Sequence, residues 1–152
     1  MNARILCVGS LKESWQKDAC AEYLKRLRRF GKYEIVEVPD ENEELGDRAI
    51  LKEGQALLRQ IRPTDYLVAL CIRAEQLSSE ALAERTSIWE SEGKKPVFVI
   101  GGSLGLSAEV LARADRRLSF SPMTFPHQLM RVILLEQLYR AEKINAGERY
   151  HK

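Results

Sequence analysis

The sequence predicts an α/β domain with a mostly parallel sheet of five to six strands and helices on both faces. Strand-like and helix-like segments alternate five times with short connections. The strand-like runs are mostly apolar throughout, which is typical of parallel strands that are buried on both faces. No repeat, linker or low-complexity stretch interrupts the 152 residues, so residues 1–152 are predicted to form a single domain.

The first half of the chain contains three strand–helix pairs. The predicted strands are residues 4–9, 33–39 and 66–72, and the predicted helices are residues 13–30, 49–61 and 79–92. Gly31, Pro63 and Gly93 end these helices, as residues of these two types commonly do. The acidic residues 40–47 are predicted to form an exposed, mobile loop. Helical spacing is expected to turn the following side chains inward: Trp15, Ala19, Tyr23, Leu27 and Phe30 in the first helix, and Leu82, Ile88 and Trp89 in the third.

The second half contains the stretch around which we expect the active site to form. An apolar strand at residues 97–100 ends at Gly101 and Gly102, and Ser107 caps a short helix that follows. A strand near Leu118 then leads through a Pro-containing loop to the last helix, residues 127–145. Open parallel sheets place ligands at the carboxyl ends of their strands. The two loops therefore predict a pocket walled mainly by backbone and apolar side chains.

The last helix is apolar around almost its whole circumference. Its central part is interrupted by four polar residues, Arg131, Glu136, Gln137 and Arg140. A helix of this kind is buried on more than one side. One side can face the sheet and another a second copy of the chain, which predicts a homodimer through this helix.

Composition excludes several classes of protein. No apolar run is long enough to span a membrane, and a strand-like run directly after Met1 and Asn2 leads us to expect no signal peptide. Three widely spaced cysteines in apolar runs predict reduced core thiols in a cytoplasmic protein. The net charge of +2 hides a basic segment, residues 1–32, with eight Lys or Arg against three acids. That segment suits either contact with a polyanion or a solvated helix face.

Single motifs in the chain are weak evidence of function. Gly101, Gly102 and Gly105 match neither a dinucleotide fingerprint nor a P-loop, and no metal-ligand spacing or nucleophile elbow occurs. His127 and Arg131 share a helix face, where a structural role is the simpler interpretation, and Glu136 with Arg140 is typical of a surface ion pair. Residues 147–152 suit either a frayed terminus or contact with RNA.

Five segments are informative in combination: Phe98-Val99-Ile100-Gly101-Gly102, Met123-Thr124-Phe125-Pro126-His127-Gln128, Glu136-Gln137-x-Tyr139-Arg140-Ala141, Lys52-Glu53-Gly54 and Tyr150-His151. Together they closely resemble the RlmH family, small SPOUT-class methyltransferases that modify a pseudouridine in large-subunit ribosomal RNA. The resemblance covers essentially the whole chain.

The resemblance implies a C-terminal trefoil knot, a homodimer, and S-adenosylmethionine bound in the knot loops. The cofactor contacts it implies are Leu70, Gly101, Gly102, Phe120, Ser121, Pro122, Met123, Thr124 and Phe125. Arg131, Arg149 and His151 are the candidates for positioning the substrate and supplying charge, with the tail facing RNA. The implied reaction is methyl transfer to N3 of the pseudouridine, with either free RNA or the assembled ribosome as substrate.

The chain departs from the family at one loop. After the third strand the family usually shows Gly-Lys, whereas this chain has Ala74 and Glu75, and Arg73 is the candidate to replace the missing charge. Two alternatives remain at this stage. The first alternative to the implied reaction is a methyltransferase that acts on another RNA site, and the second is a non-catalytic RNA- or nucleotide-binding α/β module.

Overall fold

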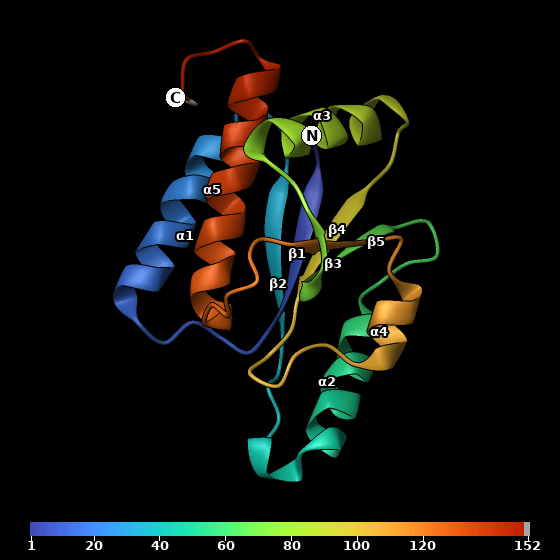
Figure 1. Ribbon diagram of the computed structural model, residues 1–152. Helices are drawn as coiled ribbons and strands as arrows, with labels where there is room; N and C mark the ends of the chain where they lie inside the picture. Colours follow the sequence, from blue (N-terminus) through green and yellow to red (C-terminus); the bar gives the residue numbers. More distant parts are fainter. Residues whose placement is uncertain (151–152) are drawn as a thin grey trace.

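A computed structural model describes residues 1–150 and arranges five strands in one parallel sheet (Figure 1). The spatial order of the strands is β2-β1-β4-β3-β5. The strands are β1 (Ala3–Val8), β2 (Tyr33–Val38), β3 (Tyr66–Gln76), β4 (Pro96–Ile100) and β5 (Arg116–Ser119). The predicted fold class, a parallel sheet with alternating helices, is confirmed, and the trefoil knot stays a prediction.

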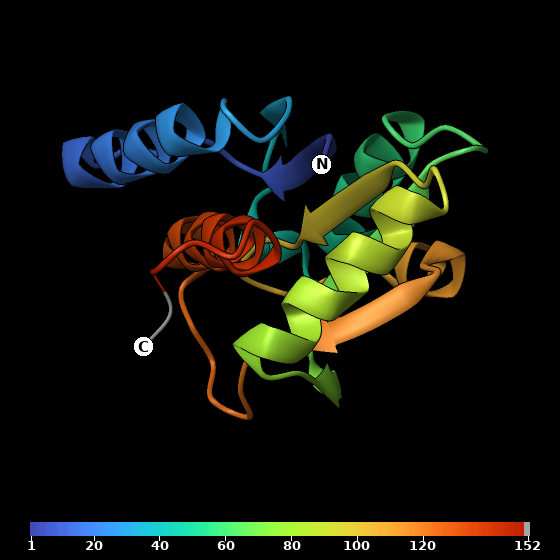
Figure 2. The ribbon, with the colours of Figure 1, turned by 90° about the horizontal axis from the view of Figure 1, so that it is seen from above.

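Helices cover both faces of this sheet. They are α1 (Ser14–Leu27), α2 (Asp47–Arg59), α3 (Ser79–Ser91), α4 (Ala108–Arg113) and α5 (His127–Asn145), with a short 3₁₀ helix, η1 (Glu43–Leu45). On one face α5 packs against both α1 and α3, and on the other face α2 packs against α4 (Figures 1 and 2).

The core lies in two layers, one on each face of the sheet. Successive side chains of a strand point to opposite faces. Ile5 of β1 therefore packs into the layer under α1, α3 and α5, whereas its neighbour Leu6 packs under α2 and α4. Phe98 and Val99 of β4 divide in the same way. Burial on both faces explains why these strands are apolar throughout.

Two side chains that were expected to face the core are exposed. Trp15 is 54% exposed and Ile88 is 43% exposed, so these two predictions are wrong. The buried residues of α1 are Gln16, Cys20 and Leu27, so burial begins one position after Trp15, although Leu27 is buried as predicted. The buried side chains of α3 are Leu82, Ala83, Thr86 and Trp89. Neighbouring positions lie about 100° apart around a helix, so an error of one residue moves a side chain out of the contact.

The strand order decides where the loops of the second half meet. β3 lies between β4 and β5, so the carboxyl ends of these three strands are neighbours at one edge of the sheet. β3 also continues beyond its predicted end at Ile72, and its register with β5 shifts between Leu70 and Glu75. The loop after β4 and the loop after β5 consequently flank the end of β3.

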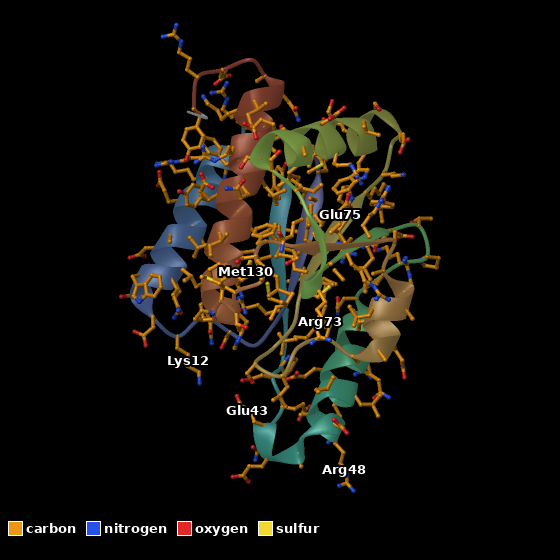
Figure 3. The ribbon with its side chains drawn as sticks, in the orientation of Figure 1. Lys12, Glu43, Arg48, Arg73, Glu75 and Met130 are labelled. Atoms are coloured by element: carbon orange, nitrogen blue, oxygen red, sulfur yellow. The ribbon has the colours of Figure 1, made fainter. Side chains whose placement is uncertain are left out.

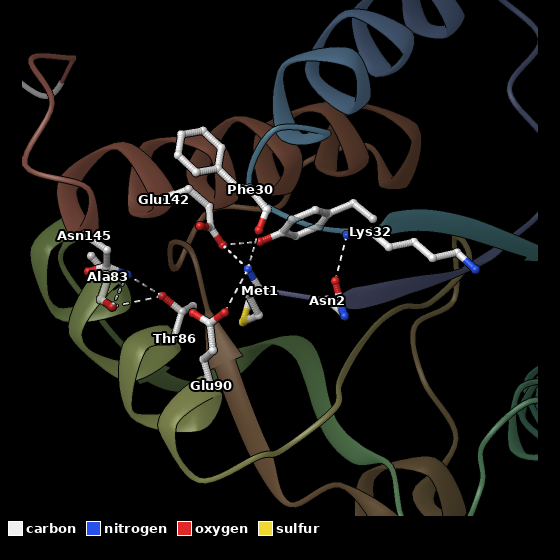
Figure 4. Close-up of polar contacts among 10 residues, drawn as sticks. Met1, Asn2, Phe30, Lys32, Ala83, Thr86, Glu90, Glu142 and Asn145 are labelled. Carbon is white, nitrogen blue, oxygen red and sulfur yellow. Dashed lines mark hydrogen bonds and ion pairs between the residues drawn. The ribbon is translucent and has the colours of Figure 1, made fainter.

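The opposite edge of the sheet carries a polar network around the amino terminus (Figure 4). The Met1 ammonium donates to the Phe30 carbonyl at 2.9 Å and to Glu142 Oε1 at 3.1 Å, and it lies 3.3 Å from Glu90 Oε1. The Tyr33 hydroxyl donates to the same Glu142 oxygen at 2.6 Å. Burial and the neighbouring Glu142 raise the pKa of Tyr33. The network joins β1, β2, α3 and α5 at the end of the sheet remote from the predicted pocket.

Candidate active site

A cavity of about 900 Å³ opens at the carboxyl edge of the sheet, where the loops after β3, β4 and β5 meet the start of α5. Most of the cofactor contacts expected from the sequence line this cavity. They are Leu70, Gly101, Gly102, Phe120, Ser121, Met123, Thr124 and Phe125. Pro122 is in the same loop but does not line the cavity. The structure therefore brings together residues that are up to 55 positions apart in the chain.

The glycine pair makes the floor of the cavity a backbone surface. A Cβ on Gly101 would lie 2.8 Å from the carbonyl carbon of Gly105 and 2.9 Å from its oxygen, so no larger residue fits without moving the loop. The loop closes on itself through a bridge between Gly102 and Gly105, and Gly105 has φ +89°. The tight turn thus leaves main-chain groups, free of side chains, facing the cavity.

Two acidic residues outside the cavity lie against this glycine loop: Glu43 accepts a hydrogen bond from it, and Glu53 packs beside Gly102. Ser103 Oγ donates a 2.5 Å hydrogen bond to Glu43 Oε1 in η1. Glu53 of α2 is buried beneath Gly102, and its carboxylate accepts a hydrogen bond from the Glu41 backbone N–H at 2.9 Å. Burial is the main cause of the raised pKa of Glu53. Sequence reasoning missed both supporting roles, and the Lys52-Glu53-Gly54 motif was the available signal for Glu53.

The loop after β5 forms the opposite wall. Ser119 Oγ donates to the Ser121 carbonyl, and the Met123 backbone N–H donates to Ser121 Oγ, each at 3.0 Å. These bonds hold the turn, while the Met123 side chain is 74% exposed at the cavity mouth. The flexible apolar side chain of Met123 at the tip of this turn can adapt to the shape of a bound ligand.

His127 lines the cavity at the first turn of α5. Its pKa lies below the usual value for histidine, first because burial disfavours the charged imidazolium and then because Arg131 is nearby. The ring is therefore mostly neutral at pH 7. A neutral imidazole can accept a proton, so His127 can act as a base in addition to any structural role.

Arg131 lies one turn further along α5 and is buried, with 1% of its side chain exposed. Its guanidinium donates to Glu37 Oε2 at 2.6 Å, to the Gly9 carbonyl at 2.6 Å and to the Val8 carbonyl at 3.3 Å. These bonds join the carboxyl ends of β1 and β2 to α5. Arg131 is not among the residues that line the cavity, and its role in positioning a substrate stays a prediction.

The tail lies at the other end of α5. The nineteen residues of α5 span about 28 Å, and Arg149, which is exposed, follows the end of the helix opposite to the cavity. Tyr150 folds back on α5: its hydroxyl donates to Glu136 Oε1 at 3.2 Å and its ring centroid lies 4.9 Å from that of Tyr139. His151, the third predicted substrate residue, lies outside the described residues.

The cavity is nearly free of charge. Among the described residues that line it, Arg73 is the only Lys or Arg, and no Asp or Glu lines it. Residues 1–150 hold no group of three His, Cys, Asp or Glu side chains able to bind a metal ion. None of the helices in that range has the length and apolar character required to cross a bilayer. The arrangement suits an organic ligand held by main-chain groups and apolar contacts.

Comparison with known proteins gives a consistent result. A family model described as "Predicted SPOUT methyltransferase" matches residues 1–151. Three relatives carry the name "Ribosomal RNA large subunit methyltransferase H". They come from Bifidobacterium animalis subsp. lactis, Clostridium novyi and Bacillus cytotoxicus, with identities of 53%, 54% and 50%, and each alignment covers the whole of both chains.

Solved structures show the same fold at low sequence identity. A methylase family protein from Haemophilus influenzae superposes with a TM-score of 0.61 at 16% identity, over 99% of this chain and 70% of the other. A methylase family protein from Neisseria gonorrhoeae gives 0.58 at 13% identity, over 91% and 81%. The fold is therefore shared well beyond the range of recognisable sequence similarity.

Proposed function

This chain belongs to the SPOUT methyltransferase family, and from that premise we propose that it transfers the methyl group of S-adenosylmethionine to N3 of a pseudouridine in large-subunit ribosomal RNA. The relatives' shared name supports a large-subunit ribosomal RNA substrate. The cofactor and the target atom come from the resemblance to the RlmH family. One observation carries the proposal: the glycine loop and the loop after β5 meet in a single cavity.

The residues present fit S-adenosylmethionine. The cavity volume of about 900 Å³ accommodates a nucleoside with an amino-acid side arm. Gly101 and Gly102 offer a backbone surface to the adenosine, and a Cβ would press against the Gly105 backbone at the first position and against Glu53 at the second. Leu70 and the loop from Phe120 to Phe125 supply the apolar and hydroxyl contacts around it.

When bound, S-adenosylmethionine supplies an electrophilic methyl group, and the protein must orient the acceptor and manage one proton. N3–H of the uracil ring has to lose its proton before or during attack. Among the described residues that line the cavity, His127 is the one whose neutral form acts as a base at pH 7, and we assign it this proton. Burial and, after it, the positive charge of Arg131 lower the pKa of His127, which favours the neutral ring that this role requires.

We further propose that the functional form is a homodimer through α5. Leu129, Val132 and Ile133 of this helix remain only partly buried in the single chain, as expected for side chains that a second copy covers. A second copy would also bring a C-terminal tail close to the cavity. Arg149 follows the far end of α5, so we propose that it contributes to methyl transfer by reaching the cavity of the other copy. A ribosomal RNA substrate further implies a cytoplasmic location.

Two experiments test the proposal. Titration calorimetry with S-adenosylmethionine should show one binding event that Gly101→Val abolishes, whereas no binding by the wild type would favour a non-catalytic module. Mass mapping of ribosomal RNA from a strain that lacks the gene should show the loss of one methylated pseudouridine, restored by the wild-type gene. A lost methyl group at any other nucleotide would identify a different RNA site.

A further inference from the structure

Arg73 stands at the mouth of the cavity on the part of β3 that extends past its pairing with β4. β4 pairs with β3 only from Tyr66 to Leu70, and the strand then continues to Gln76. Arg73 lines the cavity beside Leu70 and Cys71, and its side chain is exposed to solvent. Figure 3 shows it at the level of the glycine loop, well below the end of α3.

The charge of Arg73 is uncompensated. Within residues 1–150 its guanidinium makes no hydrogen bond and no ion pair. Glu75 is only two residues away, but its carboxylate accepts a 2.8 Å hydrogen bond from Arg85 Nη2 of α3. Figure 3 places Glu75 nearer to α3 than Arg73. Glu43, beyond the glycine loop, is bonded to Ser103. Each of these two acids thus has its own partner.

We propose that Arg73 binds a backbone phosphate of the RNA next to the nucleotide that enters the cavity. The proposal rests on the proposed function, because it requires an RNA substrate at this mouth. An arginine presents a planar fork of donors that matches a phosphate, and an exposed one keeps enough freedom to adapt to a flexible strand. As the only Lys or Arg among the described residues lining the cavity, it is the group best placed to fix the register of the RNA there.

Arg73 would then compensate for the departure from the family pattern. The resemblance to the RlmH family implies Gly-Lys in this loop, whereas this chain has Ala74 and Glu75. The acid at position 75 is neutralised by Arg85, and the cation stands two residues earlier. The loop thus keeps one positive charge at the mouth, although the residue that carries it has changed.

The test uses the full-length protein, S-adenosylmethionine and large ribosomal subunits from a strain that lacks the gene. Arg73→Ala should raise the KM for the subunits about tenfold at 0.1 M salt, and Arg73→Lys should recover part of this loss. In a log–log plot of KM against salt concentration, the slope should decrease by about 0.7 to 0.9, which is the contribution of one phosphate contact. The dissociation constant for S-adenosylmethionine, measured by calorimetry, should stay within twofold.

Arg59 provides the matched control. It is an exposed arginine at the end of α2. The carbonyl of the next residue, Gln60, accepts a hydrogen bond from Arg4 at the start of β1, so Arg59 lies at the edge of the sheet opposite to the cavity. Arg59→Ala should leave both the KM and the salt slope unchanged. An unchanged salt slope in Arg73→Ala would overturn the proposal. So would a loss confined to S-adenosylmethionine affinity, because Arg73 would then hold the cofactor carboxylate. Failure of the proposed function is separate: the wild type itself would not methylate the subunits.

Discussion

At the scale of single residues, Gly101 is the position in the cavity where geometry leaves no room for a side chain. Gly101→Val would drive a side chain against the backbone of Gly105, which cannot yield as a flexible side chain would. We expect S-adenosylmethionine affinity to fall at least about a hundredfold, because the loop must leave the position in which it meets the ligand. Calorimetry measures the loss, and a thermal melt of the same sample checks that the domain remains folded. Wild-type affinity in a folded Gly101→Val protein would contradict this picture of the cavity floor.

His127 provides a prediction about pH. Its pKa is lowered in the folded state, so between that pKa and the usual value near 6.5 the unfolded chain binds more protons than the folded chain. The contribution of His127 to stability is therefore complete above pH 6.5 and is lost as the pH falls through the lowered pKa. Urea unfolding at pH 7.5 and pH 5.5 should show a smaller pH dependence in His127→Asn than in the wild type. Equal pH dependence in the two proteins would argue against a perturbed histidine.

At the scale of elements, Arg131 is the joint between α5 and the ends of β1 and β2. Arg131→Met keeps most of the apolar stem but leaves the carbonyls of Val8 and Gly9 without their donor. Loss of a buried charged donor of this kind costs about 3 kcal/mol in the free energy of unfolding. Arg140→Met is the matched control on the same helix, because the Arg140–Glu136 pair is partly exposed and should contribute less than about 1 kcal/mol. Similar losses in the two variants, measured by urea unfolding, would show that Arg131 has no special structural role.

The elements also show which features sequence patterns can predict. Gly101, Gly102 and the loop after Leu118 were predictable because a strand that meets a chain-breaking segment is a local signal. The bonds of Arg131 were not, since Glu37 lies 94 residues away and only the packing of α5 on the sheet brings the two together. The insertion of β3 between β4 and β5 is equally non-local, because apolar runs predict strands but not their spatial order. The predictions for Trp15 and Ile88 were wrong for a different reason: periodicity predicts a buried helical stripe only to within one residue at its edges.

At the scale of the whole molecule, α5 separates the proposed cofactor cavity from Arg149, the proposed substrate-binding residue of the tail. The cavity surrounds the first turn of the helix and Arg149 follows its last turn. A twofold arrangement that contacts the same helix in both copies can place each tail at the partner's cavity. We therefore expect sedimentation at micromolar concentration to show a dimer. A protein that remains monomeric at that concentration would leave Arg149 with no cavity to serve.

The dimer makes a sharper prediction, which a mixture of two inactive variants tests. Gly101→Val removes the cofactor floor and Arg149→Ala removes the tail cation, so homodimers of either variant should lack activity. Co-expression of the two chains produces mixed dimers in which one cavity combines an intact floor with an intact tail. With random pairing, half of the dimers are mixed and one of their two sites is restored, so methylation should recover to about a quarter of the wild-type rate. A homodimer of the double variant, which carries both substitutions in each chain, serves as the control for residual activity. If each cavity used the tail of its own chain, no mixed dimer would contain a complete site, and the mixture would be as inactive as its components.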